Sequence, residues 1–295
     1  MRTLLFLAGT VLHAAAMAAD VVPLTFINNI PFVTVTVGAV SSRLMIDSGG
    51  ALGLSLPEKT ISQSGAVTLL DQKTKFADLQ GKVYEVRNFI ADPVVVGKSG
   101  LGPVDGRVHV QWGGAAEGLE AELTKARGAG AIGLAAFGRR PLMFDYRLRT
   151  LAMYAPGEGP QAEQQDWQAL RLEYGKEGPN VALTVNGKAL KFVLDTGAQV
   201  NLVNAQSMAP GTAASRCLPK TADTRDCDPR DLGQVQDSAG RSLGRLAAER
   251  VSLAGAPFDG ILGAPFFERY RVLIDLSSHR LLISPYDKPA AGRPE

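Results

Sequence analysis

The sequence is poor in the residues that build metal sites and has almost no net charge. Three histidines and two cysteines are too few for a typical zinc site. Lys and Arg number 31 against 29 for Asp and Glu, and the resulting net charge of +2 offers no basic surface for nucleic acid. Aromatic residues make up only 6%, whereas 32 glycines and 17 prolines predict many turns and favour β structure. No metal, cofactor or nucleic acid is therefore expected to take part in the function.

The N-terminus has the pattern of a secretory signal peptide over residues 1–19. Arg2 supplies the charge, residues 4–12 are apolar, and Ala16 and Ala18 have the small side chains of a cleavage site. The apolar run is shorter than the ~20 residues of a membrane-spanning helix, which favours cleavage over an uncleaved anchor. The mature protein is expected to be soluble and periplasmic or secreted, with no membrane contact after cleavage.

Two cysteines, Cys217 and Cys227, lie close together in a polar stretch. An exported protein can keep a disulfide, and we expect a structural bridge that closes a small surface loop. The alternative is a redox pair, but such pairs usually have the C-x-x-C spacing.

The chain contains an internal repeat. Residues 33–49 align without a gap with residues 181–197, 148 positions later, and residues 131–153 align with 261–283, 130 positions later. The first copy therefore has 18 extra residues (148 − 130) between its two blocks. Alternating apolar residues at the start of each copy are typical of a half-buried strand, and Asn186-Gly187 predicts a hairpin turn. Each copy is expected to be a small, mostly β unit.

The repeat also predicts the domain boundaries. The first domain is expected over residues 20–156 and the second over residues 168–287. The segment 157–167 between them is polar and without periodicity, which is typical of a linker. Residues 288–295 are expected to form a frayed tail.

Each copy has one acidic residue directly after an apolar strand, in Asp47-Ser48-Gly49 and Asp195-Thr196-Gly197. A carboxylate at such a place is unusual, because aspartate is rarely buried unless it is paired. The glycine permits a sharp turn and a close backbone approach, and the hydroxyl can bond to the opposite copy. One such tripeptide is most simply a capped turn, but two at equivalent positions indicate one shared central site.

This pattern resembles the aspartic proteases, both the retropepsin-like family and the bilobed pepsin-like enzymes. The two D-[ST]-G motifs match, as do the later motifs of two apolar residues and glycine at 131–133 and 261–263. The length of each half is similar to that of a bacterial tandem retropepsin-like protein. The resemblance implies a mainly β, two-lobed acid-protease fold with two pseudo-symmetric retropepsin-like β-barrel domains.

The resemblance also implies the chemistry. Asp47 and Asp195 would be the catalytic dyad, supported by Ser48, Gly49, Thr196 and Gly197. The chain would be an aspartic endopeptidase that needs no cofactor and binds a peptide or protein substrate in extended conformation across one cleft. Because both lobes lie on one chain, a monomer is expected, with a dimer of chains as the alternative.

Two features depart from the family pattern. Gly50 stands where the family usually has Ala, Ser or Thr, and no motif marks the residue that closes over the substrate. Tyr84 is a candidate for this flap role, with an ordinary strand aromatic as the simpler interpretation. The alternative function is therefore a catalytically inactive peptide-binding or scaffold protein with the same fold.

A helix is expected over residues 115–127, within the extra residues of the first copy, as a surface feature rather than a cover over the cleft. The G-x-G-x-x-G spacing at 128–133 follows this helix instead of a strand, so it does not predict a dinucleotide site. Asp145 and Asp275 match across the repeat and are expected to stabilise turns between strands.

Overall fold

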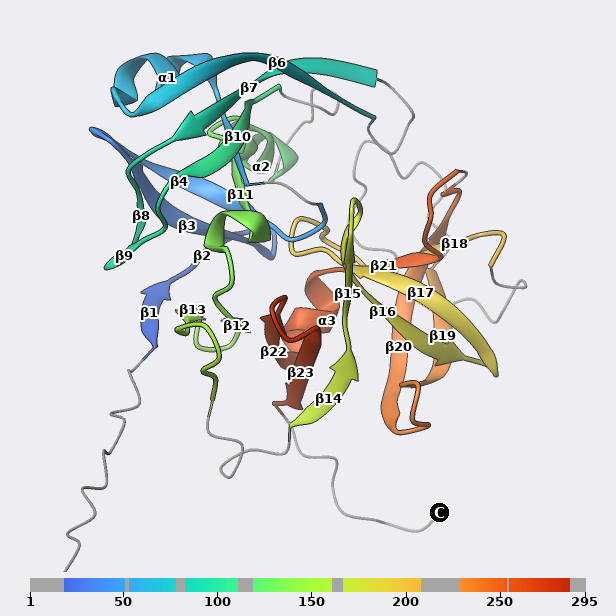
Figure 1. Ribbon diagram of the computed structural model, residues 1–295. Helices are drawn as coiled ribbons and strands as arrows, with labels where there is room; N and C mark the ends of the chain where they lie inside the picture. Colours follow the sequence, from blue (N-terminus) through green and yellow to red (C-terminus); the bar gives the residue numbers. More distant parts are fainter. Residues whose placement is uncertain are drawn as a thin grey trace, which may run out of the picture.

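The computed structural model describes residues 19–50, 53–77, 83–110, 119–160, 167–207, 229–253 and 255–286. The chain is mainly β and forms two lobes above a sheet that both share, which confirms the predicted fold class (Figure 1). Cys217, Cys227, the tail and all but the end of the predicted signal peptide lie outside the described residues, so their predictions stay predictions. Within the described ranges, none of the helices has the length and hydrophobicity needed to span a membrane.

The first lobe is built on a ten-stranded sheet in the order β6-β7-β10-β5-β11-β4-β3-β8-β9, with β2 paired to β3. One face of this sheet contacts the main hydrophobic core, and the other face carries a smaller apolar cluster under a helix. The strands are β2 (Thr25–Ile27), β3 (Ile30–Val37), β4 (Val40–Asp47), β5 (Leu54–Leu56), β6 (Val67–Ala77), β7 (Val83–Ala91), β8 (Val94–Val96), β9 (Ser99–Gly100), β10 (Val104–Val108) and β11 (Ala131–Gly133).

The second lobe has a seven-stranded sheet in the order β15-β16-β17-β21-β18-β20-β19. Since β16 also pairs with β19, six of these strands close into a barrel. The turn between β16 and β17 has positive φ at both Asn186 and Gly187, as the sequence predicts for a two-residue hairpin loop. The strands are β15 (Glu173–Gly175), β16 (Gly178–Val185), β17 (Lys188–Leu194), β18 (Leu202–Asn204), β19 (Pro229–Gln236), β20 (Ser242–Val251) and β21 (Gly260–Leu262).

A six-stranded sheet in the order β1-β13-β12-β22-β23-β14 joins the lobes (Figure 1). At its centre β12 of the first copy pairs with β22 of the second, with Leu142 opposite Ile274. Asp145 and Asp275 accept backbone hydrogen bonds from the turns that follow them, in the role that the sequence predicts. The strands are β1 (Asp20–Pro23), β12 (Leu142–Asp145), β13 (Thr150–Met153), β14 (Gln168–Arg171), β22 (Tyr270–Asp275) and β23 (Arg280–Pro285).

Four short helices complete the described structure: α1 (Glu58–Ser64), α2 (Leu119–Arg127), the 3-10 helix η1 (Leu134–Phe137) and α3 (Ala264–Arg269). Helix α2 belongs to the segment predicted as helical, of which residues 115–118 lie outside the described ranges. Its Leu123 is fully buried in the smaller apolar cluster, together with Phe32 and Met45. The helix thus packs by one side on the first-lobe sheet and exposes the other, in line with the prediction of a surface feature.

Candidate active site

The two predicted aspartates follow equivalent strands in the two lobes. β4 ends at Asp47, and β17 ends one residue before Asp195. A short strand runs parallel to each of them: β11 places Gly133 beside Asp47, and β21 places Leu262 beside Leu194. The motifs of two apolar residues and glycine thus lie directly next to the loops that carry the carboxylates.

Ser48 and Thr196 tie the two loops together by reciprocal hydrogen bonds. The Ser48 hydroxyl donates to the Leu194 carbonyl at 2.8 Å and accepts from the Thr196 backbone N–H at 2.9 Å. The Thr196 hydroxyl donates to the Ile46 carbonyl at 2.7 Å and accepts from the Ser48 backbone N–H at 3.1 Å. Both side chains are 0% exposed, so these four bonds hold the lobes in one register at the point where the aspartates emerge.

The glycines of both motifs bring the carboxyl groups together. A Cβ atom added to Gly49 would lie only 2.4 Å from Cγ of Asp195, in the opposite lobe. A Cβ atom added to Gly197 would lie 3.1 Å from Oδ1 of Asp195 and 3.5 Å from Oδ1 of Asp47. Both carboxyl groups therefore approach one common point, which only a residue without a side chain leaves open.

Each carboxylate also accepts a hydrogen bond within its own loop. Gly49 N–H donates to Oδ1 of Asp47 at 2.9 Å, and Gly197 N–H donates to Oδ1 of Asp195 at 2.7 Å. These bonds fix the rotation of both carboxyl groups, and the Ala198 N–H adds a second backbone hydrogen bond to Asp195 that lowers its pKa. The two halves of the site are thus nearly symmetric.

The electrostatics of the two aspartates follow from burial and from their mutual approach. Burial, followed by the negative charge of Asp47, raises the pKa of Asp195 to about 7. Burial also raises the pKa of Asp47, against the Gly49 N–H and the positive charges of Arg107 and Arg127. Since the two groups interact, they titrate as a pair that holds one proton over a range of pH.

Two arginines from the first lobe break this symmetry, and sequence reasoning missed both. Arg127, the last residue of α2, donates from Nη2 to the Gly197 carbonyl at 3.0 Å and so bonds to the opposite lobe's loop. Arg107 in β10 places its guanidinium 3.9 Å from the centre of the Phe76 ring. A comparison of the two copies could not find them, because neither has an arginine at the matching place in the second copy.

Tyr84 lies where the sequence predicts it, in a hairpin between the two motif blocks. The hairpin consists of β6 and β7, and Tyr84 is opposite Phe76 with the two rings stacked 5.3 Å apart. The hairpin tip, residues 78–82, is outside the described residues. The flap role of Tyr84 therefore stays a prediction.

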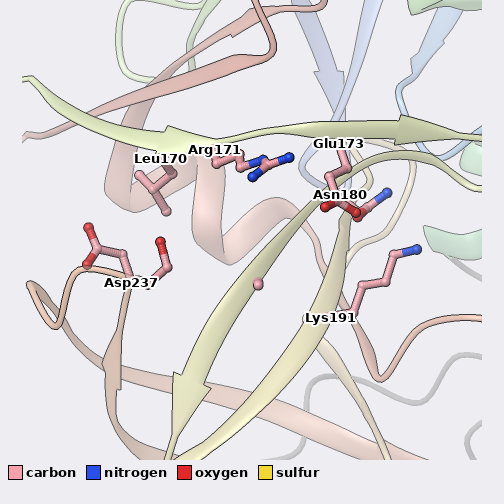
Figure 2. Close-up of a pocket in the computed structure, with 8 residues that line it drawn as sticks. Leu170, Arg171, Glu173, Asn180, Lys191 and Asp237 are labelled. Atoms are coloured by element: carbon pink, nitrogen blue, oxygen red, sulfur yellow. The ribbon is translucent and has the colours of Figure 1, made fainter.

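A separate hollow of about 180 Å³ lies on the second lobe (Figure 2). Two charged residues that line it already form ion pairs within the protein: Lys191 with Glu177 at 2.5 Å, and Asp237 with Arg241 at 2.7 Å. Among the described residues, no three His, Cys, Asp or Glu side chains are grouped so that they could hold a metal ion. The residues that line the hollow are Leu170, Arg171, Glu173, Asn180, Ala182, Lys191, Asp237 and Ser238.

Comparison with known proteins shows the fold. No protein-family model matches the sequence, and no curated protein matches it. Among solved structures, the chain is similar to the aspartic proteinase from Irpex lacteus, with a TM-score of 0.60 and 14% identity. The match covers 91% of this chain and 97% of that one. The chain thus has the two-lobed fold of the acid proteases, reached at a sequence identity too low to transfer an activity.

Proposed function

We propose that this chain is an exported aspartic endopeptidase, active as a monomer in the periplasm or outside the cell, with Asp47 and Asp195 as its catalytic pair. The observation that carries the proposal is the convergence of the two carboxyl groups on one point beside Gly197. The reciprocal bonds of Ser48 and Thr196 support it, because a pair of ordinary turns would not need a buried link between lobes.

The mechanism follows from a pair of carboxyl groups that share one proton. The ionised carboxylate accepts a proton from a water molecule, whose oxygen attacks the carbonyl carbon of the peptide bond. The protonated carboxyl group donates its proton to the carbonyl oxygen, so the intermediate carries no net charge. The carboxyl group that took the proton from water then protonates the peptide nitrogen, while the other carboxylate takes a proton from a hydroxyl of the intermediate. The C–N bond breaks, and the pair again holds one proton.

This chemistry needs the raised pKa values that burial gives the pair. At a pH below about 7, the pair keeps a proton that an ordinary exposed aspartate would have lost. One acid and one base are then present together, whereas two ionised carboxylates that approach one common point would repel each other. Proton transfer of this kind contributes roughly 10²–10⁴-fold to the rate, and substrate positioning contributes the rest.

The alternative is an inactive peptide-binding or scaffold protein with the same fold, which Gly50 and the absence of a flap motif suggest. A Cβ atom at Gly50 would meet no described atom within 4 Å, so the usual Ala, Ser or Thr would make no close contact with either aspartate there. The structure therefore offers no steric reason for inactivity at this position.

The test is peptide cleavage by the protein without residues 1–19, with the products identified by mass spectrometry between pH 3 and 8. Asp47→Asn and Asp195→Asn should each abolish cleavage while circular dichroism stays unchanged. Asp71→Asn, at an exposed position, is the matched control and should keep full activity. Cleavage that survives both dyad substitutions would reject the mechanism, and peptide binding without cleavage by the unaltered protein would favour the alternative.

A further inference from the structure

The first-lobe sheet presents one row of side chains on the face that carries Asp47. Strand register places Met45 of β4 beside Ala131 of β11, Ala131 beside Ser55 of β5, and Ser55 beside Arg107 of β10. Residues paired across strands point to the same face, and Asp47 shares that face with Met45 because side chains alternate. Arg107 is therefore on the same face as Asp47, three strands away.

The opposite face of β10 is closed. A Cβ atom added to Gly106 would lie 2.2 Å from the ring of Phe89, which is fully buried in the main core. Arg107 thus extends away from the core, where its guanidinium covers the face of Phe76. Phe76 in turn stacks on Tyr84, so a cation and two aromatic rings form one column along the β6–β7 hairpin.

Among the described residues, the Arg107 guanidinium has no anionic partner of its own. No hydrogen bond or ion pair joins it to any residue in the described ranges, and the residue is only half-buried. Burial lowers its pKa, and the charge of Asp47 offsets part of this effect. The neighbouring Glu85 forms ion pairs with Lys73 at 3.1 Å and Lys75 at 3.2 Å. Because side chains alternate along a strand, Glu85 points to the opposite face of the hairpin from Tyr84.

The charges around the pair favour an acidic ligand. The pair carries one negative charge when it holds one proton, and Arg107 and Arg127 bring two positive charges to the same region. Arg127 already donates a hydrogen bond to the Gly197 carbonyl. The guanidinium N–H groups of Arg107, by contrast, have no hydrogen-bond acceptor among the described residues. Burial, followed by the positive charge of Arg107, lowers the pKa of the nearby His109. A carboxylate on the substrate would therefore meet net positive charge despite the dyad.

We propose that Arg107 is a specificity-determining residue that selects peptides with an aspartate or glutamate side chain within two residues of the cleaved bond. This inference rests on the proposed peptidase function. A peptide that crosses the dyad under the β6–β7 hairpin passes the open guanidinium, whose planar donors match a carboxylate in bidentate geometry. The partly desolvated state of Arg107 makes the gain larger than at an exposed arginine.

The experiment uses a peptide that the protein cleaves, with Glu, Gln or Lys placed in turn at the two residues on either side of the cleaved bond. At one of these positions, kcat/KM should be at least ~10-fold higher for Glu than for Gln. Arg107→Gln should reduce this ratio to near 1, and Arg107→Glu should make Lys the preferred residue. Arg87→Gln, at an exposed position of the same hairpin, is the control and should keep the ratio.

The outcomes separate this inference from the function on which it rests. Cleavage without a preference for Glu, or a preference that survives Arg107→Gln, overturns the inference and leaves the peptidase intact. An equal loss for all peptides in Arg107→Gln also overturns it, since Arg107 would then act only through the dyad. If no peptide is cleaved, the proposed function fails, and binding of the same labelled peptides to the Asp195→Asn protein decides the charge preference by itself.

Discussion

At the scale of single residues, two adjacent glycines of the first loop have opposite surroundings. A Cβ atom at Gly49 would meet the Asp195 carboxyl group, whereas one at Gly50 would meet no atom of the described residues within 4 Å. We expect Gly49→Ala to abolish peptide cleavage, because the added methyl group would push Asp195 away from Asp47. Gly50→Ala should keep activity within about twofold and stability within about 0.5 kcal/mol. Peptide cleavage and thermal unfolding of both variants measure this contrast, and equal effects of the two substitutions would contradict it.

The dyad should also make stability depend on pH. The pKa of Asp195 is raised on folding, so the folded protein binds more protons than the unfolded chain between about pH 4 and 7. The contribution of Asp195 to the free energy of unfolding must then fall as pH rises through this window. Asp195→Asn removes the buried charge, so its stability relative to the unaltered protein should rise by about 1–3 kcal/mol from pH 4.5 to 7.5.

Urea unfolding at four pH values across this window checks the prediction. The exposed substitution Asp71→Asn provides the control, for which the difference from the unaltered protein should not vary with pH. A constant difference for Asp195→Asn as well would show that the carboxyl group is not held protonated by the fold.

At the scale of elements, α2 packs mainly through Leu123 on the face of the sheet that carries Asp47. Leu123 is fully buried against residues that include Ile30 and Met45. Leu123→Ala should cost about 2–5 kcal/mol, the usual range for a buried leucine. It should also lower kcat/KM, because α2 carries the Arg127 bond to the second loop.

The matched control is Lys125→Ala, on the exposed side of the same helix. Denaturant unfolding and peptide cleavage should both be close to normal in this variant. A Leu123→Ala protein that is destabilised but fully active would show that the position of α2 does not affect the dyad.

Elements also show what the sequence could predict and what it could not. The repeat predicts the strands, the equivalent loops and the pairing of Asp47 with Asp195, because a duplicated motif needs only internal comparison. Arg107 and Arg127 lack this signal, since they lie outside the aligned blocks and have no copy in the second half. Their position depends on strand register and on helix packing, which a hydrophobic pattern does not specify. The packing of α2 on the sheet through Leu123 is not predictable from the sequence for the same reason.

At the scale of the whole molecule, the shared sheet makes the two lobes one folding unit. β12 and β22 pair at its centre, and Phe144 of β12 packs edge-to-face on Phe267 of α3, with ring centres 5.8 Å apart. Ser48 and Thr196 add a second buried link at the dyad. Neither lobe can therefore open without exposing apolar surface or buried polar groups of the other.

This coupling predicts that a destabilising substitution in the shared sheet lowers the free energy of unfolding of both lobes. Phe144 is fully buried, and Phe144→Ala should cost about 3–5 kcal/mol. Hydrogen exchange should then speed up by the same factor in β3–β4 and in β16–β17, because both are protected by one global unfolding reaction. Leu148→Ala, 74% exposed in the turn after β12, is the control and should change exchange in neither lobe. Faster exchange confined to β3–β4 would mean that the lobes unfold separately, and the dyad would then depend on docking of two independent halves.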